Sequence, residues 1–134
     1  MSSPVPPPSF EYYRGANYWN AIPMVESELR RRAADRFDQS WSEKLLEWNG
    51  APFRRALSLN CGNGWVERDL VSTGAVVSAL GVDISESSLS KAREMAAAEG
   101  LDITYQCVDS NTAEFNFDGV DLVVNFAAMH HVAR

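Results

Sequence analysis

The stretch ALSLNCGNGWVERDL, residues 56–70, indicates how this chain folds. A short apolar run ends in the loop Asn60-Cys61-Gly62-Asn63-Gly64, and a helical pattern follows it. The two glycines carry no Cβ, so the backbone can turn sharply there and approach a ligand closely. At the start of the next helix, backbone N–H groups lack a partner inside the helix and can bind a phosphate or a carboxylate. The stretch therefore predicts a strand, a ligand-binding loop and a helix.

Strand and helix patterns alternate along the rest of the chain. Strands are expected at residues 56–59, 75–83, 103–109 and 120–128. Helices are expected at residues 65–72 and 85–100, and a longer helical pattern runs from about 24 to 48, with Ser40 or Ser42 as a cap inside it. Alternating strands and helices favour parallel strands joined by right-handed crossovers. We therefore expect an α/β fold, a Rossmann-like, doubly wound parallel sheet with helices on both faces.

Composition divides the chain into three segments. Residues 1–9 form a Pro- and Ser-rich tail that is expected to be disordered, and residues 51–134 hold the core. Residues 10–50 are aromatic and helical. The aromatic side chains there either fold over a bound ligand as a lid or pack the N-terminal helix on the sheet, and they include Tyr12, Tyr13, Tyr18 and Trp19. The apolar side chains expected to lie in the core include Trp41, Trp48 and Met129.

Bulk properties limit the classes of function. The 134 residues suit one domain, and 46% apolar with 22% charged residues is typical of a soluble globular protein. A net charge of -6 argues against a nucleic-acid-binding face, and the arginines near residue 31 share a helical pattern with acids. Cys61 and Cys107 are expected to be reduced, buried thiols that form neither a disulfide nor a metal site. Without a membrane span or a signal peptide in the sequence, the cytoplasm is the expected compartment.

An acid follows the second predicted strand. Asp83 lies 19 residues after Gly64, where a carboxylate can accept hydrogen bonds from two vicinal ribose hydroxyls. The dinucleotide fingerprint requires a third Gly or Ala three residues after the second glycine, but Glu67 stands there. The order of strand, loop, helix, strand and acid therefore predicts a nucleotide-type cofactor, and Glu67 argues against NAD and FAD.

Four segments together resemble the motifs of class I S-adenosylmethionine-dependent methyltransferases. They are LSLNCGNGWVE, GVDISESSLSKAR, ITYQCVDSNTAEFNF and FDGVDLVVNFAAMHHV, and the resemblance runs from residue 56 to about 132. It implies that S-adenosyl-L-methionine is the cofactor and S-adenosyl-L-homocysteine the product. The loop 60–64 would contact the cofactor, with Asp83 on the ribose. The other residues implied to bind the cofactor are Ile84, Asp109 and Ser110 near the adenine, Asn125 and Phe126 after the fourth strand, and Tyr13 and Tyr18 from the lid.

Two residues depart from the family's first motif. Ser58 stands where the family usually has an acid near the methionine end of the cofactor, so cofactor affinity is expected to be weak. Asn60 replaces the first glycine of the motif, a change that the backbone tolerates because Asn adopts positive φ more readily than most residues.

Methyl transfer from a sulfonium requires mainly that a nucleophile be aligned behind the methyl carbon, and some acceptors also need a base. His130 and His131 are the candidates, although a packing or capping role is the alternative for both. Asn125-Phe126 is followed by alanines, whereas enzymes of this family that methylate amino groups of nucleobases carry prolines. The resemblance therefore favours a small-molecule acceptor, through oxygen, nitrogen or carbon.

The resemblance also implies a sheet of seven strands in the order 3-2-1-4-5-7-6, of which this sequence supplies four. We expect the chain to be the N-terminal part of a longer enzyme, or to complete its sheet by self-association. Two other functions stay open: a non-catalytic module that binds the cofactor, and a nicotinamide or nucleotide-sugar Rossmann enzyme.

Overall fold

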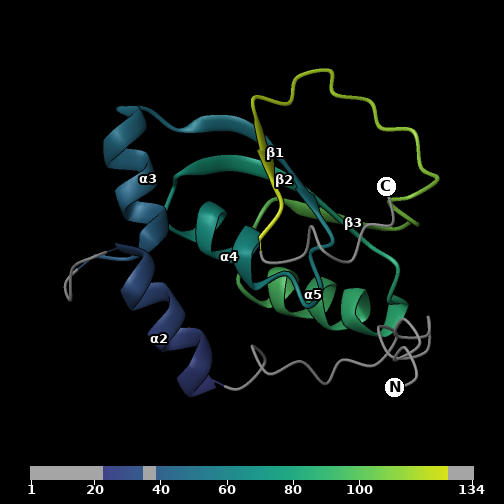
Figure 1. The fold of residues 1–134 in the computed structure, drawn as a ribbon, viewed down its shortest axis with the longest axis horizontal. Coiled ribbons are helices and arrows are strands. Elements are labelled where there is room, and N and C mark those ends of the chain that lie inside the picture. Colours follow the sequence, from purple (N-terminus) through teal and green to yellow (C-terminus); the bar gives the residue numbers. More distant parts are fainter. Residues whose placement is uncertain (1–22, 35–38, 127–134) are drawn as a thin grey trace, which may run out of the picture.

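The computed structural model describes residues 23–34 and 39–126 (Figure 1). Its elements in chain order are α2 (Pro23–Ala34), α3 (Trp41–Asn49), β1 (Phe53–Leu59), α4 (Trp65–Ser72), β2 (Val76–Asp83), α5 (Glu86–Ala98), β3 (Ile103–Cys107) and β4 (Leu122–Val124). The lid tyrosines, both histidines and Met129 lie outside the described residues.

The four strands form one parallel sheet in the order β3-β2-β1-β4. β1 pairs with β2 on one side, with Ala56 opposite Ala79, and with β4 on the other, with Ala56 opposite Leu122. The chain thus leaves β1 toward β2 and β3 and later returns to the opposite side of β1. Ligands of open parallel sheets bind beyond the carboxyl ends of the strands at such a reversal of strand order. The expected Rossmann-like parallel sheet is confirmed.

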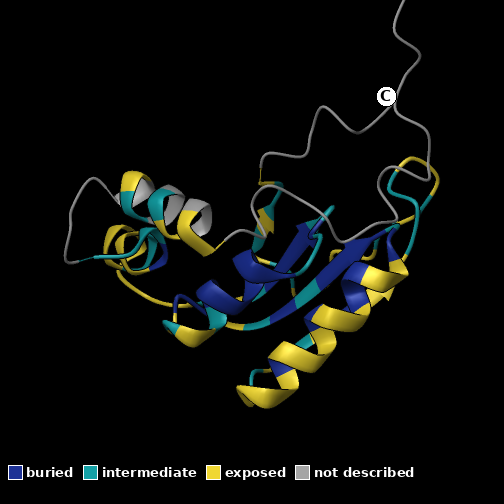
Figure 2. Ribbon diagram, turned by 90° about the horizontal axis from the view of Figure 1, so that it is seen from below, coloured by how far each residue is buried: buried dark blue, intermediate teal, exposed yellow. Residues whose placement is uncertain are grey.

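Helices α4 and α5 pack against one face of this sheet (Figures 1 and 2). Ala56 and Ala79 share that face by their register, and they lie in one buried cluster with Val66 and Leu70 of α4. In α5, Leu89, Ala92 and Ala96 recur on one side of the helix and are buried with Tyr105 of β3. Figure 2 shows the opposite side of α5 exposed. The two helices bring their N-termini to the carboxyl ends of β1 and β2.

The start of α3 decides between the two candidate caps. Ser40 accepts a hydrogen bond from the Glu43 N–H, and the Glu43 carboxylate accepts one from the Ser40 N–H at 2.7 Å, which is a capping box. Ser42 is buried, with its hydroxyl 3.1 Å from the hydroxyl of Ser40. The helical pattern expected from 24 to 48 therefore forms two helices, because the capping box begins a new helix after Ser40.

Several expectations from the sequence are wrong in detail. β1 begins earlier than expected, at Phe53, β3 ends earlier, at Cys107, and β4 is shorter, at Leu122–Val124. Trp48 is 79% exposed and Cys107 is exposed. Val123 is half exposed, so β4 is not buried on both faces of the described part. Periodicity assigns a residue to one side of an element but does not show whether a neighbour covers that side.

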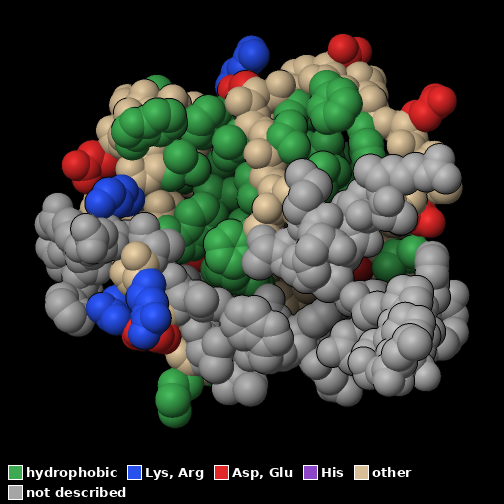
Figure 3. Space-filling view, viewed as in Figure 1, with side chains coloured by type: hydrophobic (Ala, Val, Ile, Leu, Met, Phe, Trp, Pro, Cys, Tyr) green, Lys and Arg blue, Asp and Glu red, His purple; other side chains and the backbone are tan. Residues whose placement is uncertain are grey.

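Apolar side chains lie open on the surface of the described part of the chain (Figure 3). The larger exposed ones are Trp48, Val77, Phe117 and Val123, together with Met24 and Met95 on helices α2 and α5. Of the described strands, β1 is the one that pairs with β4, so the other edge of β4 bonds to none of them.

Candidate functional site

The loop between β1 and α4 has left-handed backbone at three positions. The φ angles are 54° at Asn60, 58° at Gly62 and 74° at Gly64, and Asn60 is the one non-glycine residue with positive φ in the described part. Gly64 also lies directly over the Tyr105 hydroxyl, which a Cβ at this position would overlap. The loop therefore needs glycine at residue 64 for both its conformation and its space.

Asp83 joins this loop to the end of β2. One carboxylate oxygen accepts a hydrogen bond from the Gly62 N–H at 2.9 Å, and the other accepts one from the Ser85 N–H at 2.8 Å. Asp83 is buried, with 6% of its surface exposed. Each carboxylate oxygen has two lone pairs and uses one here, so further donors such as ribose hydroxyls can still bind.

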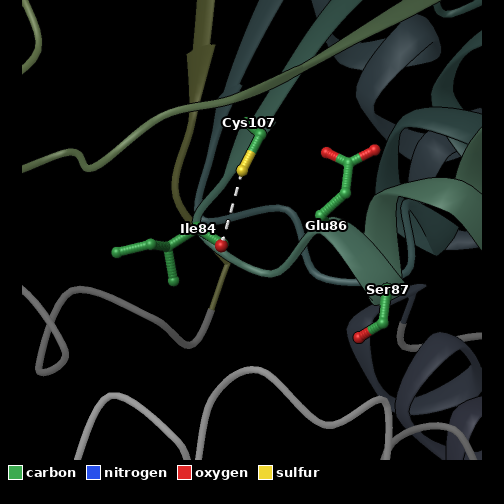
Figure 4. Close-up of a pocket in the computed structure, with 4 residues that line it drawn as sticks. All are labelled: Ile84, Glu86, Ser87 and Cys107. Atoms are coloured by element: carbon green, nitrogen blue, oxygen red, sulfur yellow. Dashed lines mark hydrogen bonds between the residues drawn. The ribbon is translucent and has the colours of Figure 1, made fainter.

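An open hollow of about 430 Å³ lies at Ile84, the residue that follows Asp83 in the chain (Figure 4). It is lined by Ile84, Glu86, Ser87 and Cys107, which come from the end of β2, the start of α5 and the end of β3. The Cys107 thiol donates to the carbonyl oxygen of Ile84 at 3.5 Å, and partial desolvation together with the nearby Glu86 carboxylate raises the pKa of this exposed thiol. Glu86 itself is bound by Arg93 at 2.6 Å, which lowers the pKa of Glu86. The hollow has one apolar wall and one ion pair at its rim.

Of the two predicted site residues after β3, Ser110 contacts the loop and Asp109 bonds Asn111 instead. Ser110 donates a hydrogen bond to the Asn60 side-chain oxygen at 3.0 Å, so it lies at the loop as the site requires. Asp109 instead accepts from the backbone and side-chain amides of Asn111, at 2.9 and 3.0 Å, and it does not line the hollow. Both bonds end on Oδ1, so an adenine amino group would have to reach the other carboxylate oxygen.

The residues after β4 lie on the other side of the loop. The Phe126 ring packs edge-on against Trp65 at a centroid distance of 5.0 Å and lies 6.4 Å from Trp41. Asn125 is partly buried beside it. Trp41 also donates to the Asp69 carboxylate at 2.9 Å, which ties α3 to α4. This aromatic group closes the end of the site next to β4.

Glu67, to which the sequence assigns no role in the site, has a buried carboxyl group near Ser58, Cys61 and Asp83. Glu67 is fully buried on α4, and burial raises its pKa to about 7, although the Ser58 hydroxyl and Arg68 act in the opposite direction. Burial and the Glu67 charge also raise the pKa values of Cys61 and Tyr105. The sequence did contain one signal for this residue: Glu67 stands at the position where close packing of the helix against the strand favours glycine.

The comparisons with known proteins identify the family. Residues 56–134 match a family model described as a methyltransferase domain. A solved structure of an S-adenosylmethionine-dependent methyltransferase from Mesorhizobium loti is 34% identical, with a TM-score of 0.53 over 61% of this chain and 36% of that one. The chain belongs to the class I S-adenosylmethionine-dependent methyltransferase family. Membership excludes the nicotinamide and nucleotide-sugar alternatives.

Two further comparisons show how much of each protein the match covers. A Methanococcus maripaludis protein described as an S-adenosyl-L-methionine-dependent methyltransferase shares the fold, with a TM-score of 0.65, 16% identity, and coverage of 88% of this chain and 51% of that one. The ubiquinone biosynthesis O-methyltransferase of Sinorhizobium fredii is 33% identical over 79 residues, which are 59% of this chain and 31% of that protein. The chain thus spans about a third of the length of the curated relatives it matches.

Neither a metal site nor a membrane-spanning helix is found within residues 23–34 and 39–126. No group of three or more His, Cys, Asp or Glu side chains is placed there to hold a metal ion. No helix in these ranges is both long and apolar enough to cross a membrane. Tyr13, Tyr18, His130 and His131 lie outside these ranges, so their roles stay predictions.

Proposed function

We propose that this chain is the cofactor-binding part of a methyltransferase that transfers a methyl group from S-adenosyl-L-methionine to a small molecule. The observation that carries the proposal is the bond between Asp83 and Gly62, which places a carboxylate against a glycine loop at the carboxyl ends of β1 and β2. The S. fredii relative, which bears the name of an O-methyltransferase of ubiquinone biosynthesis, supports a small-molecule acceptor.

The residues present fit the cofactor. The remaining lone pairs of Asp83 would accept the two ribose hydroxyls, and the apolar wall of the hollow at Ile84 would cover the adenine ring. The loop has left-handed backbone at Gly62 and Gly64, and the methionine end would contact the backbone of this loop. The Asn60 side-chain amide is buried without an acceptor and lies in the same loop, where a carboxylate oxygen could satisfy it.

The bound cofactor would supply a methyl group on a positively charged sulfur, which is already a good leaving group. The protein then has to orient the acceptor and exclude water. Asn125 and Phe126 would border the methyl end from β4, and the aromatic lid with Tyr13 and Tyr18 would cover the site. His130 or His131 would hold the acceptor or take its proton.

A second function is a module that binds the cofactor without catalysis. Ser58, in place of the acid usual in the family, favours it. Turnover by a chain extended to the length of the relatives would separate the two functions.

Calorimetric titration tests the shared cofactor site. S-adenosyl-L-methionine and S-adenosyl-L-homocysteine are expected to bind saturably, NAD is expected not to bind, and Asp83→Ala is expected to abolish binding. The matched control is Asp102→Ala, an exposed acid just before β3 at the opposite end of the sheet. Far-ultraviolet circular dichroism confirms that each variant is folded. Absence of binding by a folded wild-type chain would refute the proposal for this chain.

A further inference from the structure

Glu67 is a buried acid whose carboxyl group is poorly partnered. The residue is fully buried, and within the part of the chain that the structure describes neither carboxyl oxygen makes a hydrogen bond of ordinary geometry, although the Ser58 hydroxyl lies near it. Burying an ionised carboxylate without a partner is costly, and such a group keeps its proton instead. A buried group of this kind in a ligand-binding region requires a chemical reason.

The polar and charged groups described around Glu67 come from β1, the loop, β2, β3 and α4. Ser58 on β1 contributes a hydroxyl, Cys61 in the loop a thiol, and Tyr105 on β3 a phenol. Asp83 on β2 adds a second acid, whose charge opposes the ionisation of Glu67. Arg68 on α4 is the neighbouring cation, and its guanidinium donates to the Asn63 carbonyl at 2.5 Å and lies 3.9 Å from the Glu99 carboxylate.

The acids described in this region outnumber the cations. Asp83 binds the loop and Glu67 lies near it, whereas Arg68, the cation beside them, donates to Asn63 of the loop and lies 3.9 Å from a third acid, Glu99. A ligand that brings positive charge to the loop would favour the ionised form of Glu67, because an opposite charge nearby stabilises a carboxylate. S-adenosyl-L-methionine carries two such charges, on its ammonium and its sulfonium groups.

We propose that Glu67 is a positioning residue that releases its proton to solvent when the cationic methionine end of the cofactor binds to the loop. No other bond forms or breaks in this step. The inference rests on the proposed function. Ser58 is the neighbouring residue on β1 and stands at the position of the family's usual acid, so α4 would supply the negative charge that the strand does not.

The test measures proton release and the dependence of affinity on pH. Calorimetry in buffers of different ionisation enthalpy should detect close to one proton released on binding S-adenosyl-L-methionine at pH 6. Because the pKa of free Glu67 is about 7, the dissociation constant should be about tenfold higher at pH 6 than at pH 8. Glu67→Gln has nearly the same shape and cannot ionise, so its proton release and its pH dependence should be lost.

Two further measurements separate charge from structure. Methylthioadenosine keeps the adenine and ribose but lacks the ammonium and sulfonium groups, so its binding should release no proton from the wild-type chain. S-adenosyl-L-homocysteine keeps the ammonium group and should still release one. Ser58→Asp combined with Glu67→Gln should regain the affinity lost in Glu67→Gln alone, because a carboxylate returns to the same region from the strand.

The outcomes are distinct. Binding with no proton release, or equal release by Glu67→Gln, would overturn the role of Glu67 and leave the cofactor site intact. Equal release with methylthioadenosine would also overturn it, since no cation is then needed. Failure of the folded wild-type chain to bind S-adenosyl-L-methionine at any pH would overturn the proposed function together with this inference.

Discussion

The Asp83 carboxylate binds the Gly62 N–H, so the acid expected to contact the ligand also holds the loop in place. The two functions use different lone pairs of one group. The second oxygen bonds the Ser85 N–H at the start of α5, and a single carboxylate thereby joins the loop, β2 and the next helix. Substitution at residue 83 is therefore expected to alter both stability and cofactor affinity.

Asp83→Asn should separate these two effects. The Asn carbonyl oxygen can accept one of the two backbone hydrogen bonds, and its NH₂ group cannot accept the other, so the free energy of unfolding should fall by about 1–3 kcal/mol. Affinity for S-adenosyl-L-homocysteine should fall at least about tenfold, because one charge-assisted hydrogen bond to the ribose is lost. Urea unfolding and calorimetry measure the two quantities. Asp102→Asn is the control, and equal effects of both variants would contradict the prediction.

Glu67→Gln should change how stability depends on pH. The pKa of Glu67 is about 7 in the folded chain, against the ordinary value of 4.5. Below pH 4.5 both states hold the proton. Between pH 4.5 and 7 only the unfolded state releases it, so the free energy of unfolding of the wild type falls by about 3 kcal/mol and then stays level.

The Gln variant cannot ionise and should lack this decline. Its stability relative to the wild type should therefore increase from pH 5 to pH 7 and change little at pH 8. Urea unfolding of both chains at these pH values measures the difference. Parallel profiles for the two chains would show that Glu67 has an ordinary pKa in the folded state.

Gly81→Ala tests the space between β2 and Tyr105. A Cβ on Gly81 would lie 2.7 Å from two ring carbons of Tyr105 and 3.0 Å from the Cys61 sulfur. Overpacking of this kind should reduce the free energy of unfolding by about 1–3 kcal/mol. In a Tyr105→Leu background the same substitution should cost less, and the double-mutant cycle measures the coupling. Additive costs would mean that the ring does not limit this position.

Asp121→Ala should loosen β4. The Asp121 carboxylate accepts hydrogen bonds from the Arg54 and Arg55 N–H groups, each at 2.9 Å, and these bonds lower its pKa. Because the folded pKa is lowered, this contribution to stability is present above pH 4 and declines as the pH falls through the folded pKa. Hydrogen exchange at pH 6 should become faster at Arg54, Arg55 and β4 in the variant, with α5 unchanged as the internal control. Unchanged exchange at the two arginines would refute the role of Asp121.

The parallel strands and the loop were predictable from the sequence because they depend on local signals, whereas the strand order was implied by the family resemblance. Apolar runs mark the strands, glycines mark the loop, and alternation with helices implies parallel pairing. The family resemblance rests on the same segments, and the match over residues 56–134 confirms it. Whether Asp83 and the loop bind the cofactor stays a prediction.

The exposure of Trp48 and the burial of Glu67 were not predictable, because both depend on what covers a side chain. Helical spacing places Trp48 on the same side of α3 as Trp41. Trp41 packs against Trp65, whereas Trp48, in the last turn of α3, is exposed to solvent. An acid in the first turn of a helix normally faces solvent and the helix dipole. Only the three-dimensional arrangement of Ser58, Cys61 and Tyr105 shows that Glu67 is enclosed.

The bonds from Asp121 to β1 also bear on the order in which the sheet assembles. Pairing of β1 with β2 joins Ala56 to Ala79, whereas Asp121 meets Arg55 across 66 positions of sequence. Closing the longer loop costs about 1 kcal/mol more in chain entropy, so β4 should be the last strand to dock during folding. A strand of three residues that arrives late has few contacts to define its register, and a slip by one residue would turn Val123 to the helix-covered face. Because the Asp121 carboxylate accepts hydrogen bonds from two consecutive N–H groups of β1, it fixes the register of β4 against β1, which three residues of strand define only weakly.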